Sequence, residues 1–402
     1  MTSDGPGERL EAAAARLRRL GIDSVESYAW RDLDDPDAGG SELHADEIFR
    51  RWAEVGVTIT HRTSTVDRAR SFSRNGYDVI QQGGRFDVFA RVIGRQSIRR
   101  RPPSTATIEI WNGVPWFGPL WAPRRRVVWM HHVHREMWDD ALPFPLSAGG
   151  RLVETRIAPL VYRGSNIATL SDSSAAEIRA LGIEHLTVIP PGVHERFTPD
   201  RERRSVRPHV VIVGRLAPVK RQRLALEALE RARRAHPMLT VDIVGDGPDR
   251  SAVAAWIAEH EAAEWVRLLG RVDDTELLEA YRRAWLVVSA SHAEGWGMSL
   301  TEGGACATPC VATDIAGHRG AAEPDRTGLL VSDHGTPASV AERLGDAVTA
   351  LLADDRRRNR LAEAAVDHAA VFSWTSVATR HLSLLGDSVG QSDSAGVVDS
   401  VE

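Results

Sequence analysis

Short apolar segments alternate with helix-like segments along most of the chain, and this alternation limits the fold more than any other feature. Such alternation is typical of a mostly parallel sheet covered by helices. A helix is predicted at 1–20, and another at 42–55 with Ser41 as its N-cap. The strands predicted in the first half are residues 23–30, 57–60, 77–80, 87–92, 107–111, 126–130, 166–170 and 187–189.

The same pattern starts again after residues 190–208, which are rich in proline and arginine and are predicted to be a linker. The later strands are predicted at 210–213, 239–244, 266–269, 286–289 and 309–313, and the helices at 221–235, 250–260, 275–283 and 299–306. The chain is therefore expected to be an α/β protein with two doubly wound, Rossmann-like domains, residues 1–200 and 201–371. Two such domains are expected to face each other across a ligand-binding cleft. The polar residues 387–402 are predicted to be a disordered tail.

The segment 292–304, HAEGWGMSLTEGG, follows an apolar run and combines a glycine turn with the start of a helix. Glycines allow close approach of the backbone to a ligand, and the free N–H groups of a first helical turn favour a phosphate. Ser299 is predicted to cap this helix, with Glu302 as its capping-box partner. Glu294 and Glu302 can accept hydrogen bonds from sugar hydroxyls, so the segment indicates a ligand with diphosphate and sugar parts. A capped helix whose glycines serve only the turn is the alternative.

Lys220 is the only lysine among 50 basic residues. A bias toward arginine of this kind is expected from a GC-rich genome, so a retained lysine indicates a place where a compact ammonium group is needed. Survival of one surface lysine by chance is the alternative. Lys220 is therefore a candidate for contact with an anionic ligand.

Composition excludes several classes of protein. A net charge of −5 gives no general attraction for nucleic acid. Cys306 and Cys310 are the only cysteines; they lack a second ligand pair for zinc and exclude a disulfide framework, which fits a reducing cytoplasm. No signal peptide is recognised, and no apolar run approaches the roughly 18 residues that span a membrane. A cytoplasmic protein is expected.

Four motifs occur in order in the second half: VIPPGVHERFTP (188–199), VIVGRLAPVKR (211–221), VDIVGDGPDR (241–250) and EGWGMSLTE (294–302). This set resembles the C-terminal domain of family 4 glycosyltransferases, which are retaining enzymes with the GT-B fold. DPDAGGSELH (35–44) and VVWMHHVH (127–134) are similar to the acceptor-domain loop and histidine of that family. The resemblance covers roughly residues 22–386. It implies that residues 372–386 form a helix that crosses back to the N-terminal domain.

The resemblance implies roles for individual residues. Arg215 and Lys220 would hold the donor diphosphate, Glu302 the ribose hydroxyls, and Glu294 the transferred sugar, while His131 would touch that sugar near its outer hydroxyls. The implied catalytic residues are thus Glu294, His131, Arg215 and Lys220. The implied donor-binding residues are Gly39, Gly40, Gly214, Arg215, Lys220, Val272, Glu294, Gly295, Trp296, Gly297, Met298, Ser299 and Glu302.

The acceptor is expected to meet Trp111, Asn112 and His132 in the N-terminal domain. Five tryptophans and an arginine run lie close together in residues 111–138. Tryptophan can stack on sugar rings, and tryptophan with arginine also suits a membrane-facing surface, so a lipid-linked acceptor and peripheral contact with the inner face of the plasma membrane are expected. Tryptophans in the core and solvated arginines are the alternative.

No metal site is expected. His131 and His134 lie in a loop without a matching carboxylate, and the acidic turn with Asp34, Asp35 and Asp37 lacks the strand context of a DxD site. One departure from the family concerns the run 315–324, IAGHRGAAEP, where His318 and Arg319 replace the usual residues and are expected to alter contacts to the donor.

These observations predict a retaining, metal-independent hexosyltransferase that uses a nucleotide-diphospho sugar and needs no cofactor. Its acceptor hydroxyl is expected on a glycan, a glycolipid or a small molecule, such as a precursor of the cell envelope. Two alternatives remain: a nucleotide-sugar 2-epimerase of similar architecture, and a non-catalytic protein that binds a sugar nucleotide. The sequence names neither the base nor the sugar.

Overall fold

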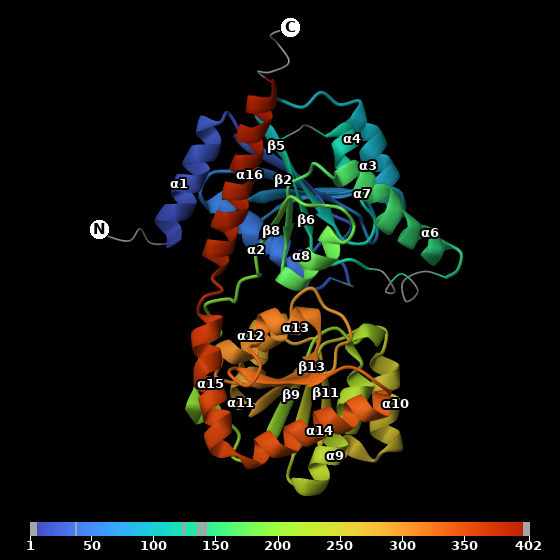
Figure 1. The fold of residues 1–402 in the computed structure, drawn as a ribbon, viewed down its shortest axis with the longest axis vertical. Coiled ribbons are helices and arrows are strands. Elements are labelled where there is room, and N and C mark those ends of the chain that lie inside the picture. The colour runs from blue at the N-terminus through green and yellow to red at the C-terminus, as the bar shows by residue number, and fades with distance from the viewer. Residues whose placement is uncertain (1–5, 37, 123–124, 135–137, 139–142, 397–402) are drawn as a thin grey trace. The chain divides into compact units, whose positions relative to one another are not determined.

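The computed structural model describes residues 6–36, 38–122, 125–134, 138 and 143–396. The chain divides into two compact units (Figure 1). Unit 1 consists of Met1–Gly192 together with Trp374–Glu402, and unit 2 is Val193–Ser373. Each unit contains one sheet with helices packed on it, as the alternation of segments predicts.

Unit 1 contains an eight-stranded sheet in the order β3-β4-β2-β1-β5-β6-β7-β8. All neighbours pair in parallel except β3 and β4, which are antiparallel. The strands are β1 (Ser24–Tyr28), β2 (Thr58–Thr63), β3 (Arg70–Arg74), β4 (Tyr77–Gln81), β5 (Thr105–Trp111), β6 (Arg126–Met130), β7 (Ile167–Thr169) and β8 (Leu186–Val188). The edge strand β3, RSFSR, is not among the predicted strands because its polar sequence lacks the apolar residues of a buried strand.

The helices of unit 1 lie on both sides of this sheet (Figure 1). They are α1 (Pro6–Arg19), α2 (Gly40–Glu54), α3 (Asp87–Ser97), α4 (Gly118–Trp121), α6 (Leu146–Leu152), the π-helical turn η1 (Val153–Ile157), α7 (Ala158–Tyr162), α8 (Asp172–Arg179) and α16 (Trp374–Gly396). The predicted strand at 87–92 is wrong, because this segment begins α3. Its buried residues Val88, Phe89, Val92 and Gln96 recur at the spacing of one helix face rather than at every second position.

Unit 2 contains a six-stranded, fully parallel sheet in the order β11-β10-β9-β12-β13-β14. Its strands are β9 (His209–Val213), β10 (Thr240–Val244), β11 (Val266–Gly270), β12 (Leu286–Ser289), β13 (Cys310–Asp314) and β14 (Gly328–Ser332). Its α-helices are α9 (Gln222–Ala235), α10 (Arg250–Glu259), α11 (Asp274–Arg283), α12 (Met298–Ala305), α13 (Ala316–Ala321), α14 (Pro337–Ala353) and α15 (Asp355–Ala369). The 3₁₀ turns are η2 (Arg201–Arg203), η3 (Pro218–Lys220) and η4 (Ala262–Glu264).

The segment expected to be a linker is largely part of unit 2. The unit begins at Val193, whose N–H donates to the Phe372 carbonyl at 2.7 Å, rather than at residue 201. Arg204 is also anchored, since its guanidinium donates to the carbonyls of Ala284 and Ala307. Proline and arginine here therefore mark an irregular but packed segment, not a free connection.

Helix α16 extends further than expected. It runs to Gly396, so part of the predicted disordered tail is helical, and Ser388 and Val389 are buried. The Trp52 indole N–H of α2 donates to the Ala378 carbonyl of α16 at 2.9 Å, which ties the end of the chain to the first half of unit 1. Residues 397–402 lie outside the described part. Within the described ranges, none of the helices combines the length and apolar character required to span a bilayer.

Three histidines of unit 1 form a buried cluster. The ring of His44 meets that of His131 at 5.0 Å and that of His381 at 5.3 Å between centroids. None of the three is more than 5% exposed. No hydrogen-bond partner is found for either ring nitrogen of His44 or His381, or for Nε2 of His131, among the described residues. Burial, together with the other histidines of the cluster, lowers the pKa of all three well below 6.5, so the rings are neutral at pH 7.

We expect unit 1 to lose stability as the pH falls below about 6.5. The unfolded chain then binds protons that the folded cluster does not, which lowers the free energy of unfolding by up to about 1.4 kcal/mol per pH unit for each histidine. Urea denaturation between pH 8 and pH 5, followed by tryptophan fluorescence, measures this dependence. His44→Phe keeps an aromatic ring without a titrating group and should reduce the slope. Equal slopes in the variant and the wild type would contradict this assignment.

Candidate functional site

The sheet of unit 2 reverses its strand order between β9 and β12, which lie side by side. Ligands of open α/β sheets bind beyond the carboxyl ends of the strands at such a reversal. Gly214 and Arg215 follow β9 directly, Lys220 ends the short turn η3, and Glu294 lies five residues after β12. The fold thus gathers at one point residues that are about 80 positions apart in the sequence.

Lys220 and Glu294 form an ion pair at this point. The Lys220 Nζ lies 2.8 Å from the Glu294 Oε1, and the Glu294 side chain is 8% exposed while that of Lys220 is 27% exposed. Burial alone would raise the pKa of Glu294, but the Lys220 ammonium and the hydrogen bond with His318 outweigh it and hold that pKa well below 4.5. Glu294 is therefore a carboxylate at physiological pH, held beside the Lys220 ammonium.

His318 is a further member of this group. It lies in α13 and is fully buried, with its Nδ1 2.7 Å from the Thr313 carbonyl oxygen. Its Nε2 lies 3.3 Å from the Glu294 Oε1 and 3.2 Å from the Ser289 Oγ. The sequence indicates that His318 departs from the family pattern, but its contact with Glu294 follows only from the fold.

The loop before α12 has a different start from the predicted one. Gly297 is the N-cap residue, and no side chain caps this helix, so the capping box of Ser299 and Glu302 is wrong. The Gly297 N–H instead donates to the Gly317 carbonyl at 3.0 Å. A Cβ at Gly317 would lie 2.2 Å from the Glu294 carbonyl oxygen, so only glycine lets α13 come this close to the loop. Trp296 packs over Gly320 and is 7% exposed.

Glu302 faces α11 rather than the start of its own helix. The Tyr281 hydroxyl donates to the Glu302 Oε2 at 2.7 Å. Burial raises the pKa of Glu302 to about 7, although the hydrogen bond from Tyr281 and the charge of Arg196 oppose the increase. Glu302 therefore changes between a carboxylate, which can accept two hydrogen bonds from a diol, and a protonated carboxyl group, which accepts less well, near neutral pH.

The remaining predicted donor residues of unit 2 lie along the same edge of the sheet. Gly214 has φ of +150°, and its carbonyl oxygen would be 2.0 Å from a Cβ at Gly245. The Arg215 carbonyl accepts a hydrogen bond from Gln222 at 2.8 Å. Val272 follows β11, which lies two strands from β9, a distance of roughly 10 Å at the usual strand spacing. The edge from Val272 to Glu294 is therefore long enough for an extended ligand.

Unit 1 reverses its strand order between β1 and β5. The predicted residues Gly39 and Asn112 lie beyond these two strands: the Gly39 N–H donates to Glu42 at 2.8 Å, and the Asn112 amide donates to the Ser41 Oγ at 3.1 Å. Gly40 is the first residue of α2, and its N-cap is Gly39 rather than Ser41. The glycine loop and Asn112 thus come together at this reversal.

The tryptophans of residues 111–138 do not form a binding surface. Trp111 is 1% exposed, its indole N–H donates to the Gly113 carbonyl at 2.9 Å, and its ring packs against Tyr162. Trp116, Trp129 and Trp138 are also buried, and only Trp121 is partly exposed. The prediction that Trp111 meets the acceptor is wrong, because every residue of the central strand β5, including Trp111 at its end, is buried. Arg124 lies outside the described residues.

Two buried carboxylates shape the loops around these positions. Glu109 accepts hydrogen bonds from the N–H groups of Trp116 and Gly118, and burial raises its pKa to about 7. Glu154 accepts hydrogen bonds from the His134 N–H at 2.9 Å and from the Trp138 indole at 3.0 Å. The sequence does not indicate either role.

The histidines after β6 differ in exposure. His131 is buried in the cluster with His44, whereas His132 is half-buried and stacks on His134 at 4.6 Å between ring centroids. In the described ranges no group of three histidine, cysteine or acidic side chains could hold a metal ion. Of the acidic turn, Asp34 pairs with Arg70 and Arg74, and Asp37 lies outside the described residues.

Known proteins share both the sequence pattern and the fold. A family model described as "Glycosyl transferases group 1" matches residues 195–368. A Nocardia farcinica protein named D-inositol 3-phosphate glycosyltransferase is 35% identical over 422 residues, which cover 93% of this chain and 90% of the relative.

Solved structures confirm the predicted GT-B class. Sucrose-phosphate synthase from Thermosynechococcus elongatus superposes with a TM-score of 0.71 at 18% identity, covering 94% of this chain and 100% of that one. Anabaena HepE in complex with UDP and glucose gives a TM-score of 0.69 at 16% identity, covering 90% of this chain and 99% of that one. Together with the ordered motifs, the site at the reversal of unit 2 and the 35% identical relative, these likenesses show that the chain is a glycosyltransferase and belongs to the group 1 glycosyl transferases, the family 4 enzymes of GT-B fold.

Proposed function

We propose that this glycosyltransferase is retaining and metal-independent, and that it moves a hexose-type sugar from a nucleotide-diphospho sugar to an acceptor hydroxyl. The observation that carries the proposal is the buried pair of Lys220 and Glu294 at the reversal point of the unit 2 sheet. An ammonium suits a diphosphate, and a fixed carboxylate suits the hydroxyls of a sugar. HepE, which shares the fold, is described in complex with UDP and glucose, so a UDP-sugar is the first donor to test.

The donor would extend along the carboxyl edge of the sheet. Its base would lie beside Val272, its ribose at Glu302, its diphosphate at Arg215, Lys220 and the start of α12, and its sugar at Glu294. The backbone of residues 295–299 would complete the diphosphate and sugar contacts. The base, diphosphate and sugar contacts would thus follow β11, β9 and β12, in the order of these strands in the sheet, and Glu302 would reach the ribose from α12.

Transfer with retention would not need a nucleophile from the enzyme. The leaving diphosphate would remain on the face of the sugar that the acceptor approaches and would take the acceptor proton. Arg215 and Lys220 would stabilise the charge that develops on the leaving group. Glu294 would stay a carboxylate held by Lys220 and His318. A glycosyl adduct trapped on any carboxylate would contradict this route.

The acceptor would bind near Gly40, Asn112 and His132 in unit 1. Asn112 is fixed by Ser41, and His132 is partly exposed, so both side chains can meet a polar ligand. The buried tryptophans no longer support a membrane-facing surface. Donor turnover that proceeds without any acceptor would favour an epimerase instead.

Lys220→Ala should abolish most donor binding. The loss of a charge-assisted contact is worth about 1.5–3 kcal/mol, which corresponds to a roughly 10- to 100-fold weaker affinity. A thermal-shift panel of UDP-, GDP-, ADP- and dTDP-sugars measures the effect and identifies the base. Arg223→Ala removes an exposed cation of α9 one turn away and should leave every shift unchanged. Equal shifts in wild type and Lys220→Ala would contradict the diphosphate assignment.

Donor affinity should weaken as the pH falls through about 7, because protonated Glu302 accepts hydrogen bonds from ribose hydroxyls less well. Titration calorimetry at pH 6 and pH 8 tests this expectation. Glu302→Gln should bind weakly at both values. Tyr281→Phe removes a hydrogen bond that lowers the pKa of Glu302, so the midpoint should move to higher pH. A wild-type affinity independent of pH would contradict the role of Glu302.

Substitutions of the adjacent histidines His131 and His132 should have different effects on stability and on transfer. His131 packs in the core of unit 1, so we assign its effect to stability, and His132→Ala should lower the transfer rate without changing the melting temperature. His131→Ala should lower the melting temperature by several degrees. The opposite outcome would be a lower transfer rate in His131→Asn at an unchanged melting temperature, with a normal transfer rate in His132→Ala. That outcome would assign the sugar contact to His131.

A further inference from the structure

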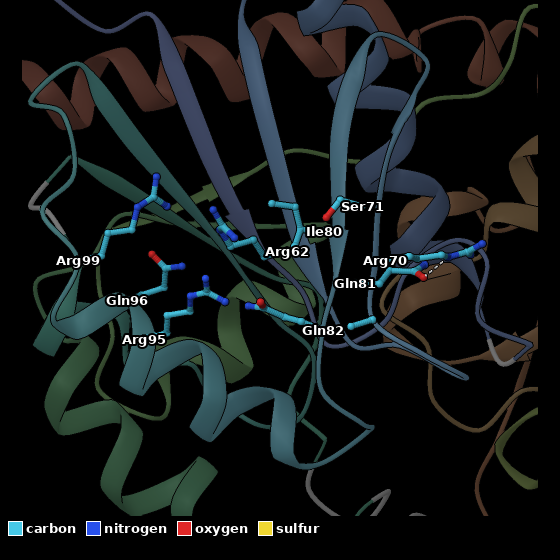
Figure 2. Close-up of a pocket in the computed structure, with 10 residues that line it drawn as sticks. Arg62, Arg70, Ser71, Ile80, Gln81, Gln82, Arg95, Gln96 and Arg99 are labelled. Atoms are coloured by element: carbon cyan, nitrogen blue, oxygen red, sulfur yellow. Dashed lines mark hydrogen bonds between the residues drawn. The ribbon is translucent and has the colours of Figure 1, made fainter.

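A cavity of about 580 Å³ lies within unit 1, between the carboxyl-terminal ends of β2 and β4 and the helix α3 (Figure 2). Its lining includes four arginine and three glutamine side chains. Figure 2 shows Arg62, Arg95, Arg99 and Gln82 gathered around the space beside α3, whereas Arg70 and Gln81 point away from it toward each other. We call the group of Arg62, Arg95, Arg99 and Gln82 the arginine pocket.

The arginine pocket has more positive charge than its own contacts neutralise. Arg62 and Arg99 both reach the Oε1 of Glu26, at 3.4 and 2.7 Å, and Arg101 reaches its Oε2 at 3.1 Å. Three guanidinium groups thus share one carboxylate. Arg95 has no ion pair with any described residue. Among the described residues, the three arginines of the pocket thus have only Glu26 as an acidic partner, and they share it with Arg101.

Donor groups of this pocket also lack acceptors. Arg62 is 9% exposed, and its Nε is buried with no hydrogen-bond partner among the described residues. The Nε2 of Gln82, which can only donate, is buried and unpaired as well. Buried donors are costly when unpaired, and both of these belong to residues that line the cavity.

The last turn of α3 adds an unmatched charge. Arg95 lies in that turn, and Arg99 follows the helix, which ends at Ser97. Arg91, one turn before Arg95, is matched by Asp87, whereas Arg95 has no acidic partner among the described residues. The unmatched charge is therefore that of Arg95, which borders the cavity.

We propose that the arginine pocket of unit 1 binds the phosphate group of a small phosphorylated molecule. Planar guanidinium groups pair with phosphate oxygens by two parallel hydrogen bonds, and a phosphate dianion supplies enough acceptors for Arg62, Arg95, Arg99 and Gln82 together. The cavity volume exceeds that of a phosphate ion and falls in the range of small-molecule sites, so the organic part of the ligand is accommodated beside it. This inference does not depend on the identity of the transferred sugar.

Titration calorimetry with inorganic phosphate, in a zwitterionic buffer at fixed ionic strength, tests the proposal. Wild type should show saturable binding, and Arg95→Gln should bind at least tenfold more weakly. Arg91→Gln is the matched control, because it removes an arginine of the same helix that borders no part of the cavity. Lys220→Ala removes the proposed diphosphate contact of unit 2 and should leave phosphate binding unchanged.

Other outcomes would overturn the inference. Equal affinity in wild type and Arg95→Gln, or no saturable binding to wild type, would exclude the pocket as a phosphate site. Loss of binding in Lys220→Ala alone would assign the phosphate to the donor site. Acetate that binds as tightly as phosphate would reduce the pocket to a general anion site. Arg99→Gln provides a second variant, and an unchanged melting temperature shows that either protein is folded. Phosphate binding that persists in a protein without transferase activity would keep this inference and reject only the proposed function.

Discussion

The buried ion pair between Lys220 and Glu294 is the interaction on which the candidate site depends. A carboxylate that is 8% exposed is unfavourable unless a cation and hydrogen bonds compensate for its lost hydration, and Lys220 and His318 supply both. The pair also orients the ammonium toward the carboxyl end of β9. It exists because the sheet of unit 2 reverses its strand order between β9 and β12, which brings the ends of these two strands together.

The same compensation recurs in unit 1, where buried carboxylates hold irregular segments in place. Glu109 binds the N–H groups of Trp116 and Gly118, and Glu154 binds the His134 N–H. These bonds anchor the segment that leads into α4 and the backbone at His134. The arginine pocket is the exception, since its Arg62 and Arg99 share Glu26 with Arg101, and its Arg95 has no ion pair among the described residues. A buried charged group whose hydrogen bonds are all made within the protein stabilises the fold. A group of like charges with too few partners is suited to binding a ligand of opposite charge.

Errors in the predicted fold arise where local pattern and tertiary context disagree. Residues 87–92 contain enough apolar side chains for a strand, but the helical spacing becomes clear only when Gln96 is included in the buried face. The edge strand β3 is too polar to be recognised and is defined by its backbone pairing with β4. The tryptophans of residues 111–138 suggest a surface when counted along the chain. In the structure, β5 and β6 are central strands that are buried on both faces, so Trp111 and Trp129 lie in the core.

The sequence by itself determined the α/β class, the two Rossmann-like sheets, the family and the importance of Lys220, because apolar periodicity and ordered motifs are local properties of the chain. Only the tertiary structure decided which of these residues touch. The contact of His318 with Glu294, the bond of Tyr281 to Glu302, the burial of His131 and the convergence of Arg62 with Arg95 all join separate elements. Such contacts depend on strand order and side-chain direction, and these are set by the packing of the whole unit rather than by any one segment.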